Sequence, residues 1–206
     1  MPVYNSTLLH TCDGVRDPYR RASFSLCNRL LRQAWNLTWF FLYRPSPRLC
    51  FGWRNLLLRL FGARLGRDCR FYPDSRVWAP WNLECEAVVT VAEGVEIYNQ
   101  GAVRIGSHAI LSQRSYLCTS THDYNDPNFP LLAYSMEIGA YAWICARAVV
   151  GPKICVGEGA VLGLASVAAY DLKPWGVYAG SPAVRVRERV IPFSGETAVA
   201  DREERR

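Results

Sequence analysis

The chain has 206 residues, half of them hydrophobic and a fifth charged. This composition fits one folded domain of ordinary size, with room for a small appendage, better than it fits a disordered chain. The formal net charge of +6 is almost wholly arginine, because only Lys153 and Lys173 are lysines. The arginines are scattered from Arg16 to Arg206, which argues against a nucleic-acid-binding stripe. A phosphorylated small molecule or an anionic membrane surface remains open as a partner.

The cysteines show no CxxC pair and no finger-like spacing with histidine; they are residues 12, 27, 50, 69, 85, 118, 145 and 155. This spacing argues against a disulfide framework or a zinc site and favours small buried thiols in a reducing cytosol. The opening MPVYNSTLLHTCDGVRDPYRR lacks a basic start followed by an apolar run, so no secretory signal is expected. We therefore expect a cytoplasmic protein.

Residues 24 to 43 predict a helix that becomes increasingly apolar along its length. The stretch from Ala34 to Tyr43 carries no charge, but it is shorter than the ~20 apolar residues needed to span a bilayer. Two interpretations stay open at this point. The helix packs on the main domain, or it lies at a membrane surface with its aromatic side chains in the headgroup layer.

A second short helix is predicted for residues 53 to 62, after the helix-breaking sequence RPSPR at 44 to 48. Gly62 is the expected C-terminal cap of this helix. The two helices together define an N-terminal helical segment, residues 1 to 63, for which a membrane-surface role and a role in packing a trimer are both open.

A six-residue period begins at Leu65. From Ile138 the chain reads IGAYAW, ICARAV, VGPKIC, VGEGAV, LGLASV, AAYDLK, with an aliphatic or alanine first position and a small second position. Such a period is neither helical nor strictly alternating. It predicts short strands that wind round a solenoid, three to a coil, because each repeat must bury its apolar face against the coils above and below.

The repeat recurs upstream in three other phases, which begin at Leu65, Val91 and Ile105. Between these blocks the register slips by two residues near 89 to 91 and near 103 to 105. The first block is the least regular, since it places Tyr72, Trp78 and Glu84 where small residues are expected. A terminal coil covered by the N-terminal helices would explain this irregularity.

The six-residue repeat, the excursion after CTSTHDY and the ending DLKPWGVYAGSPAVRVRER resemble the hexapeptide-repeat acyltransferases. WRNLLLRLFGARLG, VEIYNQG, LSQRSYLCTSTHDY and PWGVYAGSPA are together similar to colanic-acid-type exopolysaccharide O-acetyltransferases, over about residues 25 to 190. The resemblance implies a mainly β fold, a left-handed parallel β-helix over residues 64 to 173 with a loop at 123 to 137, followed by a C-terminal cap and charged tail, 174 to 206. It also implies a homotrimer with active sites between neighbouring subunits.

The resemblance implies an acetyl-CoA-dependent O-acetyltransferase that acts on a sugar hydroxyl in surface or exopolysaccharide biosynthesis, by direct attack with His122 as general base. Imidazole titrates in the right range for this role. His122 ends a repeat, where the chain leaves the coil. Cys118 lies four residues earlier, but a place at the start of a repeat favours an inward core thiol over a Cys–His pair. Asp123 is adjacent, yet neighbouring side chains on an extended segment diverge.

For the acceptor, Asn99 in IYNQG falls where sugar acetyltransferases of the superfamily carry a polar contact; a corner asparagine that stabilises a left-handed turn is equally open. Asp123 and Tyr124 belong to the loop 123 to 137, which is expected to cover the acceptor or to be a plain surface excursion. If the acceptor is carried on a polyprenyl lipid, the segment from Trp35 to Tyr43 could hold the trimer at the inner leaflet.

For the cofactor, Trp143 matches the family's tryptophan beside the pantetheine arm, and nearby backbone groups would come from Ala146, Gly163, Leu164 and Ala165. The sequence departs from its relatives at Ala169-Tyr170, where Thr-Lys is common, and at Val184, where a basic residue is common. Phosphate contacts would then fall to Arg185, Arg187 and Arg189, unless these form a solvated basic tail.

Two rival functions are considered. A non-catalytic trimeric scaffold would bury His122 or lack a crevice beside Trp143. A metal-dependent hydration enzyme on the same fold would need three suitably spaced histidines, and His10, His108 and His122 are wrongly spaced for this. We therefore expect no metal, and no motif supports nucleic-acid binding.

Overall fold

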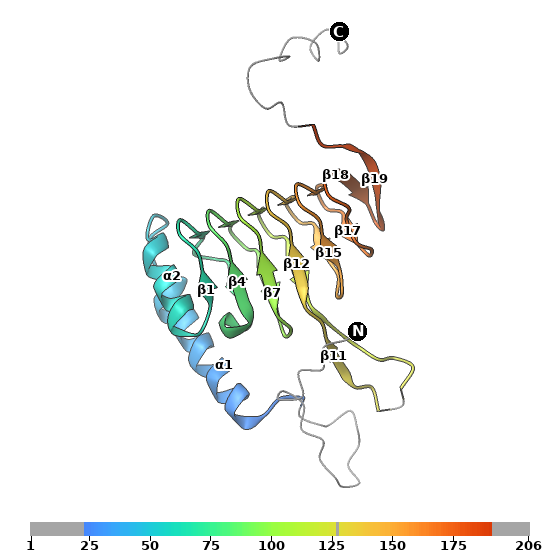
Figure 1. The fold of residues 1–206 in the computed structure, drawn as a ribbon. Coiled ribbons are helices and arrows are strands. Elements are labelled where there is room, and N and C mark those ends of the chain that lie inside the picture. The colour runs from blue at the N-terminus through green and yellow to red at the C-terminus, as the bar shows by residue number, and fades with distance from the viewer. Residues whose placement is uncertain (1–22, 127, 191–206) are drawn as a thin grey trace.

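A computed structural model describes residues 23–126 and 128–190. The chain winds as a solenoid in which each full coil adds one short strand to each of three parallel sheets (Figure 1). Sheet A contains β1 (Arg64–Leu65), β4 (Leu83–Cys85), β7 (Val103–Ile105), β12 (Met136–Ile138) and β15 (Cys155–Val156). Sheet C contains β3 (Arg76–Val77), β6 (Glu96–Tyr98), β9 (Tyr116–Cys118), β14 (Val149–Val150) and β17 (Val167–Ala168).

Sheet B is the longest of the three. It contains β2 (Arg70–Phe71), β5 (Thr90–Val91), β8 (Ile110–Leu111), β13 (Trp143–Ile144), β16 (Val161–Leu162), β18 (Gly176–Gly180) and β19 (Ala183–Glu188). The last two strands pair with each other antiparallel, so β19 ends the winding at the C-terminal end of the coil (Figure 1). The predicted parallel β-solenoid is confirmed.

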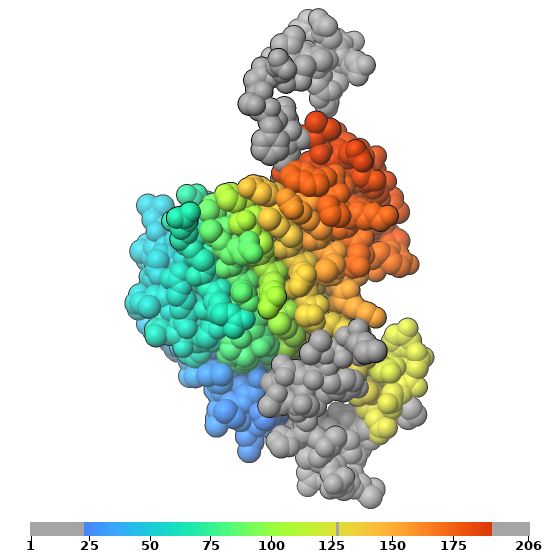
Figure 2. All heavy atoms as spheres, viewed as in Figure 1, coloured from blue at the N-terminus to red at the C-terminus, as the bar shows by residue number. Residues whose placement is uncertain are grey.

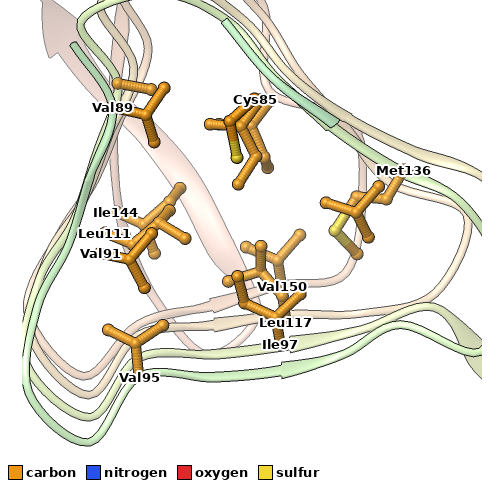
Figure 3. Packing of buried hydrophobic residues seen from close by; sticks show 14 of the residues in the cluster. Cys85, Val89, Val91, Val95, Ile97, Leu111, Leu117, Met136, Ile144 and Val150 are labelled. Atoms are coloured by element: carbon orange, nitrogen blue, oxygen red, sulfur yellow. The ribbon is translucent and has the colours of Figure 1, made fainter. Parts of the chain in front are cut away.

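The first residue of each hexapeptide fills the interior of the coil. Ile138, Ile144, Val150, Val156, Leu162 and Ala168 are each at most 2% exposed. Figure 3 shows side chains from all three sheets, among them Val91, Leu117 and Met136, that point into the triangular space that the strands enclose. Burying one large aliphatic side chain contributes about 1.5–3 kcal/mol. The core therefore comes from the column of residues that the repeat predicts.

Glycine at the second position lets successive coils nest. A Cβ on Gly139 would lie 2.5 Å from the backbone nitrogen of Glu158, and one on Gly157 would lie 2.5 Å from that of Pro174. Such distances are too short for non-bonded atoms, so a larger residue would push the next coil away.

The coil is widened at one corner. Ile144 pairs with Leu162, which is 18 residues on, whereas Ile97 pairs with Leu117, which is 20 residues on. The extra residues fall between a strand of sheet C and the following strand of sheet A, at 78–82, 99–102 and 119–135. We call these three stacked segments the C/A corner. The register slip predicted near 103 to 105 lies next to the segment 99–102. The slip predicted near 89 to 91 is misplaced, because the extra residues lie at 78–82, which contain the 3₁₀ turn η3 (Pro80–Asn82).

Two helices cover the first coil. α1 (Leu26–Thr38) continues as the π-helical turn η2 (Trp39–Tyr43), and α2 (Phe51–Leu60) follows; both lie at the N-terminal end of the coil in Figure 1. The indole of Trp35 donates to the Val77 carbonyl at 2.7 Å, and that of Trp39 donates to the Ser75 carbonyl at 2.9 Å. One face of α1 therefore packs on the main domain, as the first of the two interpretations predicts.

The end of α2 also agrees with its prediction. Gly62 follows the helix with φ +92°, a left-handed conformation that glycine adopts without strain. The Ala63 amide donates back to the Leu58 carbonyl at 3.0 Å, as in a glycine-capped helix end. Neither this helix nor any other in the described ranges has the length and apolar character to cross a bilayer.

Candidate active site

His122 lies at the C/A corner with a fixed orientation. It ends β10 (Ser120–His122), which pairs antiparallel with β11 (Leu131–Ala133). Its Nδ1 is 2.9 Å from the Phe129 carbonyl oxygen, and its ring stacks on the Phe129 ring with centroids 4.4 Å apart. Because a carbonyl oxygen only accepts, the neutral imidazole carries its proton on Nδ1 and keeps the lone pair on Nε2. This tautomer is the one that a general base at Nε2 requires.

The turn between β10 and β11 holds that carbonyl in place. The Asn125 amide donates to Asp123 Oδ1 at 3.0 Å, and the Asp123 amide donates to the Pro130 carbonyl at 3.0 Å. The Asn128 amide donates to Asp126 Oδ1 at 2.8 Å. The Asp123 carboxylate thus braces the turn that carries the partner of His122, while Tyr124 is exposed at the tip. Figure 2 shows this hairpin, in yellow, projecting from the coil.

A cavity of about 380 Å³ opens beside His122. Its lining residues are Ser23, Phe24, Tyr98, Gln100, Ser120, Thr121, His122 and Leu131. Gln100 is buried, and its Nε2 donates to the Tyr98 hydroxyl at 2.8 Å, but its Oε1 has no hydrogen-bond partner within the described residues. An unpaired buried carbonyl oxygen is costly, which makes Gln100 a candidate acceptor for a ligand hydroxyl.

Asn99 has a structural role, which corrects the prediction of an acceptor contact. It is fully buried, its Oδ1 accepts from the Ala79 amide at 2.9 Å, and its Nδ2 donates to the Ala79 carbonyl at 2.8 Å. Its backbone is not in the left-handed region either, so the alternative prediction also fails. Asn99 instead joins two successive coils at the C/A corner, and its neighbour Gln100 lines the cavity.

The cysteines require two corrections. Leu117, not Cys118, is the inward residue of β9; Cys118 is half-buried, and its thiol donates to the Ser120 carbonyl at 3.2 Å. Cys69 and Cys85 are buried, as predicted, and desolvation raises the pKa of the Cys85 thiol well above its ordinary value. Cys27 and Cys155 are exposed, so the prediction of buried thiols is wrong there. Cys12 lies outside the described residues.

The residues predicted to hold the cofactor gather on sheet B and at its edge with sheet C. Trp143, in β13, is 43% exposed, and its indole donates to Ser112 Oγ at 2.8 Å. The Ala165 amide donates to the Ala146 carbonyl at 3.0 Å, so the corner that contains Gly163 and Leu164 stacks on the corner before it. Leu164 is 71% exposed, as befits a residue that meets a ligand or a neighbouring chain.

Arg185 and Arg187 lie on β19, at the end of sheet B, and Arg189 directly follows the strand. Arg185 forms an ion pair with Glu188 at 2.8 Å, and Arg187 is exposed. Arg189 donates to the Tyr141 and Gly159 carbonyls at 2.6 and 3.0 Å, so it fastens β19 to the coil. Of the three, Arg187 is thus the one whose side chain forms no ion pair or hydrogen bond within the described residues.

The histidine and the cofactor residues do not meet within one chain. His122 lies at the corner between sheets C and A, whereas Trp143 lies on sheet B, which forms the opposite side of the triangular coil (Figure 3). A site that contains both residues needs a second copy of the chain.

Comparison with known proteins decides the family. No protein-family model matches the chain. It is 35% identical over 163 residues to WcaF of Escherichia coli (strain K12), by name a colanic acid biosynthesis acetyltransferase, and this match covers 79% of the chain and 90% of WcaF. The chain belongs to the hexapeptide-repeat acetyltransferases.

Other proteins share part of the sequence or the fold. The acetyltransferase is 26% identical over 95 residues to the galactoside O-acetyltransferase of Escherichia coli (strain K12), a match that covers 45% of this chain and 47% of that one. Among solved structures, a galactoside acetyltransferase in complex with coenzyme A has a TM-score of 0.74 at 18% identity, over 84% of this chain and 92% of that one. A hexapeptide-repeat acetyltransferase of Vibrio cholerae also has a TM-score of 0.74, at 19% identity, over 81% of this chain and 95% of that one.

Two further features of this acetyltransferase bear on the predictions. Tyr170 and Val184, the positions where the resemblance led us to expect basic residues, are both exposed, so neither is required by the core. Within the ranges that the structure describes, no three His, Cys, Asp or Glu side chains are grouped so that they could hold a metal ion. His10, the third histidine of the hydration-enzyme alternative, lies outside those ranges.

Proposed function

We propose that this acetyltransferase transfers the acetyl group of acetyl-CoA to a sugar hydroxyl in colanic-acid-like surface or exopolysaccharide biosynthesis, with His122 as general base. The observation that carries the proposal is the bond from His122 Nδ1 to the Phe129 carbonyl, which leaves Nε2 as a proton acceptor beside a cavity. The names of the relatives support the donor and the pathway: one solved relative is a complex with coenzyme A, another with acetyl-CoA, and WcaF is named for colanic acid.

In the proposed reaction, the sugar oxygen attacks the thioester carbonyl carbon while Nε2 of His122 accepts the hydroxyl proton. The carbon–sulfur bond then breaks, and the imidazolium returns the proton to the departing sulfur, so no acyl-enzyme forms. The Phe129 carbonyl favours this cycle because it holds the Nδ1–H in both states and stabilises the imidazolium. Cys118 takes no part, since its thiol is bonded to the Ser120 carbonyl.

We assign the acceptor to the cavity beside His122. A sugar presents several hydroxyl donors, and the unpaired Oε1 of Gln100 would accept from one of them. The Tyr98 hydroxyl, which accepts from Gln100 Nε2, would donate to the sugar in turn. Asp123 and Tyr124 contribute the turn and the tip of the hairpin that covers this side. The acceptor is either a free sugar or a lipid-linked glycan; in the second case the enzyme works as a peripheral protein at the inner face of the cell membrane.

We assign the active enzyme to a homotrimer. His122 of one subunit would face the cofactor residues of its neighbour, namely Trp143, Ala146, Gly163, Leu164, Ala165, Arg185 and Arg187. The separation of these residues from His122 within one chain supports this arrangement, because a rotationally symmetric ring brings the same pair of unlike surfaces together at every interface.

The first test is thiol release from acetyl-CoA with a panel of nucleotide sugars and lipid-linked glycans. We expect release that depends on one acceptor class. Gln100→Leu should raise the KM for that acceptor by about tenfold, since one buried hydrogen bond is worth roughly 1–2 kcal/mol, and should leave the KM for acetyl-CoA unchanged. A non-catalytic scaffold predicts no release with any acceptor, and equal effects of Gln100→Leu on both KM values would remove Gln100 from the acceptor site.

A mixing experiment tests the shared site. His122→Ala and Trp143→Ala should each lower activity strongly when expressed alone. Trimers assembled from both variants in equal amounts should regain about a quarter of the wild-type activity, because one interface in four then joins an intact His122 to an intact Trp143. Activity no higher than the mean of the two separate variants would show that each chain carries its own complete site.

A further inference from the structure

The N-terminal helices expose much of the apolar surface of this protein. Eleven of the 21 exposed large hydrophobic residues in the described ranges lie between Leu26 and Leu60. We call them the helical apolar surface: Leu26, Leu30, Leu31, Leu37, Phe40, Phe41, Leu42, Leu49, Trp53, Leu56 and Leu60. Apolar groups gathered in this way on one part of a protein mark an interaction site.

This surface lies opposite the face that packs on the coil. Trp35 is buried against the first coil, whereas Leu26, Leu30 and Leu37 recur at helical spacing on the other side of α1. The Trp53 indole donates to the Leu42 carbonyl at 2.9 Å, which joins α2 to η2. The two helices, which lie together at the N-terminal end of the coil in Figure 1, therefore both carry exposed apolar side chains.

The helical segment itself carries charged side chains of one sign only. Residues 23 to 67 contain eight arginines and no aspartate or glutamate. Arg29 and Arg59 are exposed on the helices themselves. Arg44 and Arg48 pair with Asp74 and Glu93 of the coil, but their side chains stay 53% and 67% exposed.

We infer that α1, η2 and α2 dock on the surface of an anionic lipid bilayer. An amphipathic helix with basic flanks lies in the plane of the membrane, with its apolar side chains below the headgroups and its arginines among the phosphates. A second copy of this chain fits the face less well, because it would bring two sets of arginines together without an acidic partner from either helical segment.

The same helix links this surface to the site. Ser23 and Phe24, directly before α1, line the cavity that contains His122. Docking through α1 therefore holds that cavity near the headgroups, where a sugar on a membrane lipid carrier would be found. This choice of acceptor rests on the proposed function; the docking itself does not.

Flotation with lipid vesicles tests the docking. Wild-type protein should float with vesicles of phosphatidylcholine and phosphatidylglycerol, and much less with phosphatidylcholine alone or in high salt. Leu30→Glu/Phe41→Glu should lower the bound fraction by about tenfold or more, because two apolar contacts are replaced by charges that the anionic surface repels. Val190→Glu, a matched change at an exposed valine near the far end of the coil, should have no effect. Trp39 is unsuitable for the test, because its indole is bonded to Ser75.

Equal flotation of wild type and double variant overturns the inference. So does a change in oligomer size in the double variant, measured by light scattering, because the face would then join copies of the chain. Thermal melts confirm that the double variant is folded. Thiol release with a water-soluble acceptor should be unchanged in it; flotation without any thiol release, from wild type or variant, would reject the proposed function and leave the docking intact.

Discussion

Replacing His122 with alanine should lower kcat for acetyl transfer by about 10²- to 10⁴-fold, the usual contribution of a general base. The KM for acetyl-CoA should change little, because the contacts assigned to the cofactor come from residues of sheet B and its edge and not from His122. Steady-state thiol release, with the acceptor that the panel identifies, measures both constants. The loss is expected in kcat because Nε2 acts on the proton that leaves the sugar as the new bond forms.

His108→Ala is the matched control for this variant. His108 also stacks on an aromatic ring, that of Tyr141 at 4.9 Å between centroids, but it is exposed where His122 is half-buried, and it lies outside the C/A corner. It should retain full activity. Equal turnover by His122→Ala and wild type would reject the base, and an equal loss in both histidine variants would point to a general effect of surface histidines.

Replacing Arg54 with methionine should lower the free energy of unfolding by roughly 3–5 kcal/mol, because each buried acceptor that loses its donor costs about 1–3 kcal/mol. Arg54 is fully buried in α2, and burial lowers the pKa of its guanidinium from the ordinary value. Its nitrogens donate to the Phe71, Pro47 and Arg48 carbonyls at 2.5, 2.8 and 2.6 Å, and to Ser46 Oγ at 2.9 Å. Methionine fills similar space but removes the donor to the Phe71 and Arg48 carbonyls and to Ser46 Oγ. The Pro47 carbonyl keeps the Cys50 amide as a donor, at 3.0 Å.

Urea unfolding followed by circular dichroism measures this loss. Arg59→Met provides the control on the same helix, because Arg59 is exposed although it also donates to two carbonyls, those of Leu65 and Gly66. It should cost at most about 0.5–1 kcal/mol, since water can replace an exposed donor. Similar urea midpoints for the two variants would show that the hydrogen bonds from Arg54 to residues 46–48, between the helices, do not stabilise the fold.

Much of the coil could be predicted from the sequence because one residue in six must point inward, and this constraint repeats without exception from Ile138 to Leu162. The first register slip was misplaced for a physical reason. Leu83 and Cys85 are both apolar and both buried, so either could be taken as the first, inward residue of its hexapeptide. Only the pairing of Leu65 with Cys85 shows that Cys85 continues the inward column.

The site could be predicted only in part. The end of a repeat and the THDY resemblance point to His122, but its orienting partner is a main-chain oxygen of Phe129, and no side-chain pattern encodes such a bond. The sequence predicts Asn99 as the residue that contacts the acceptor, whereas it is the neighbouring Gln100 that lines the cavity. The side chain of Asn99 is turned toward the backbone of Ala79 and bonds to it, and Ala79 lies 20 residues earlier in the chain. A contact between residues so far apart cannot be read from the local sequence.

The C/A corner tolerates changes in length that the rest of the coil does not. Residues added at 78–82, 99–102 or 119–135 leave the inward column undisturbed, since the parallel pairs on either side close again in register. Insertions and deletions can therefore accumulate at this edge, where the sugar is recognised in the proposed enzyme, while the nested glycine turns elsewhere tolerate almost none. A protein built in this way can diversify its choice of carbohydrate over evolutionary time without redesigning the face that we assign to the acetyl donor.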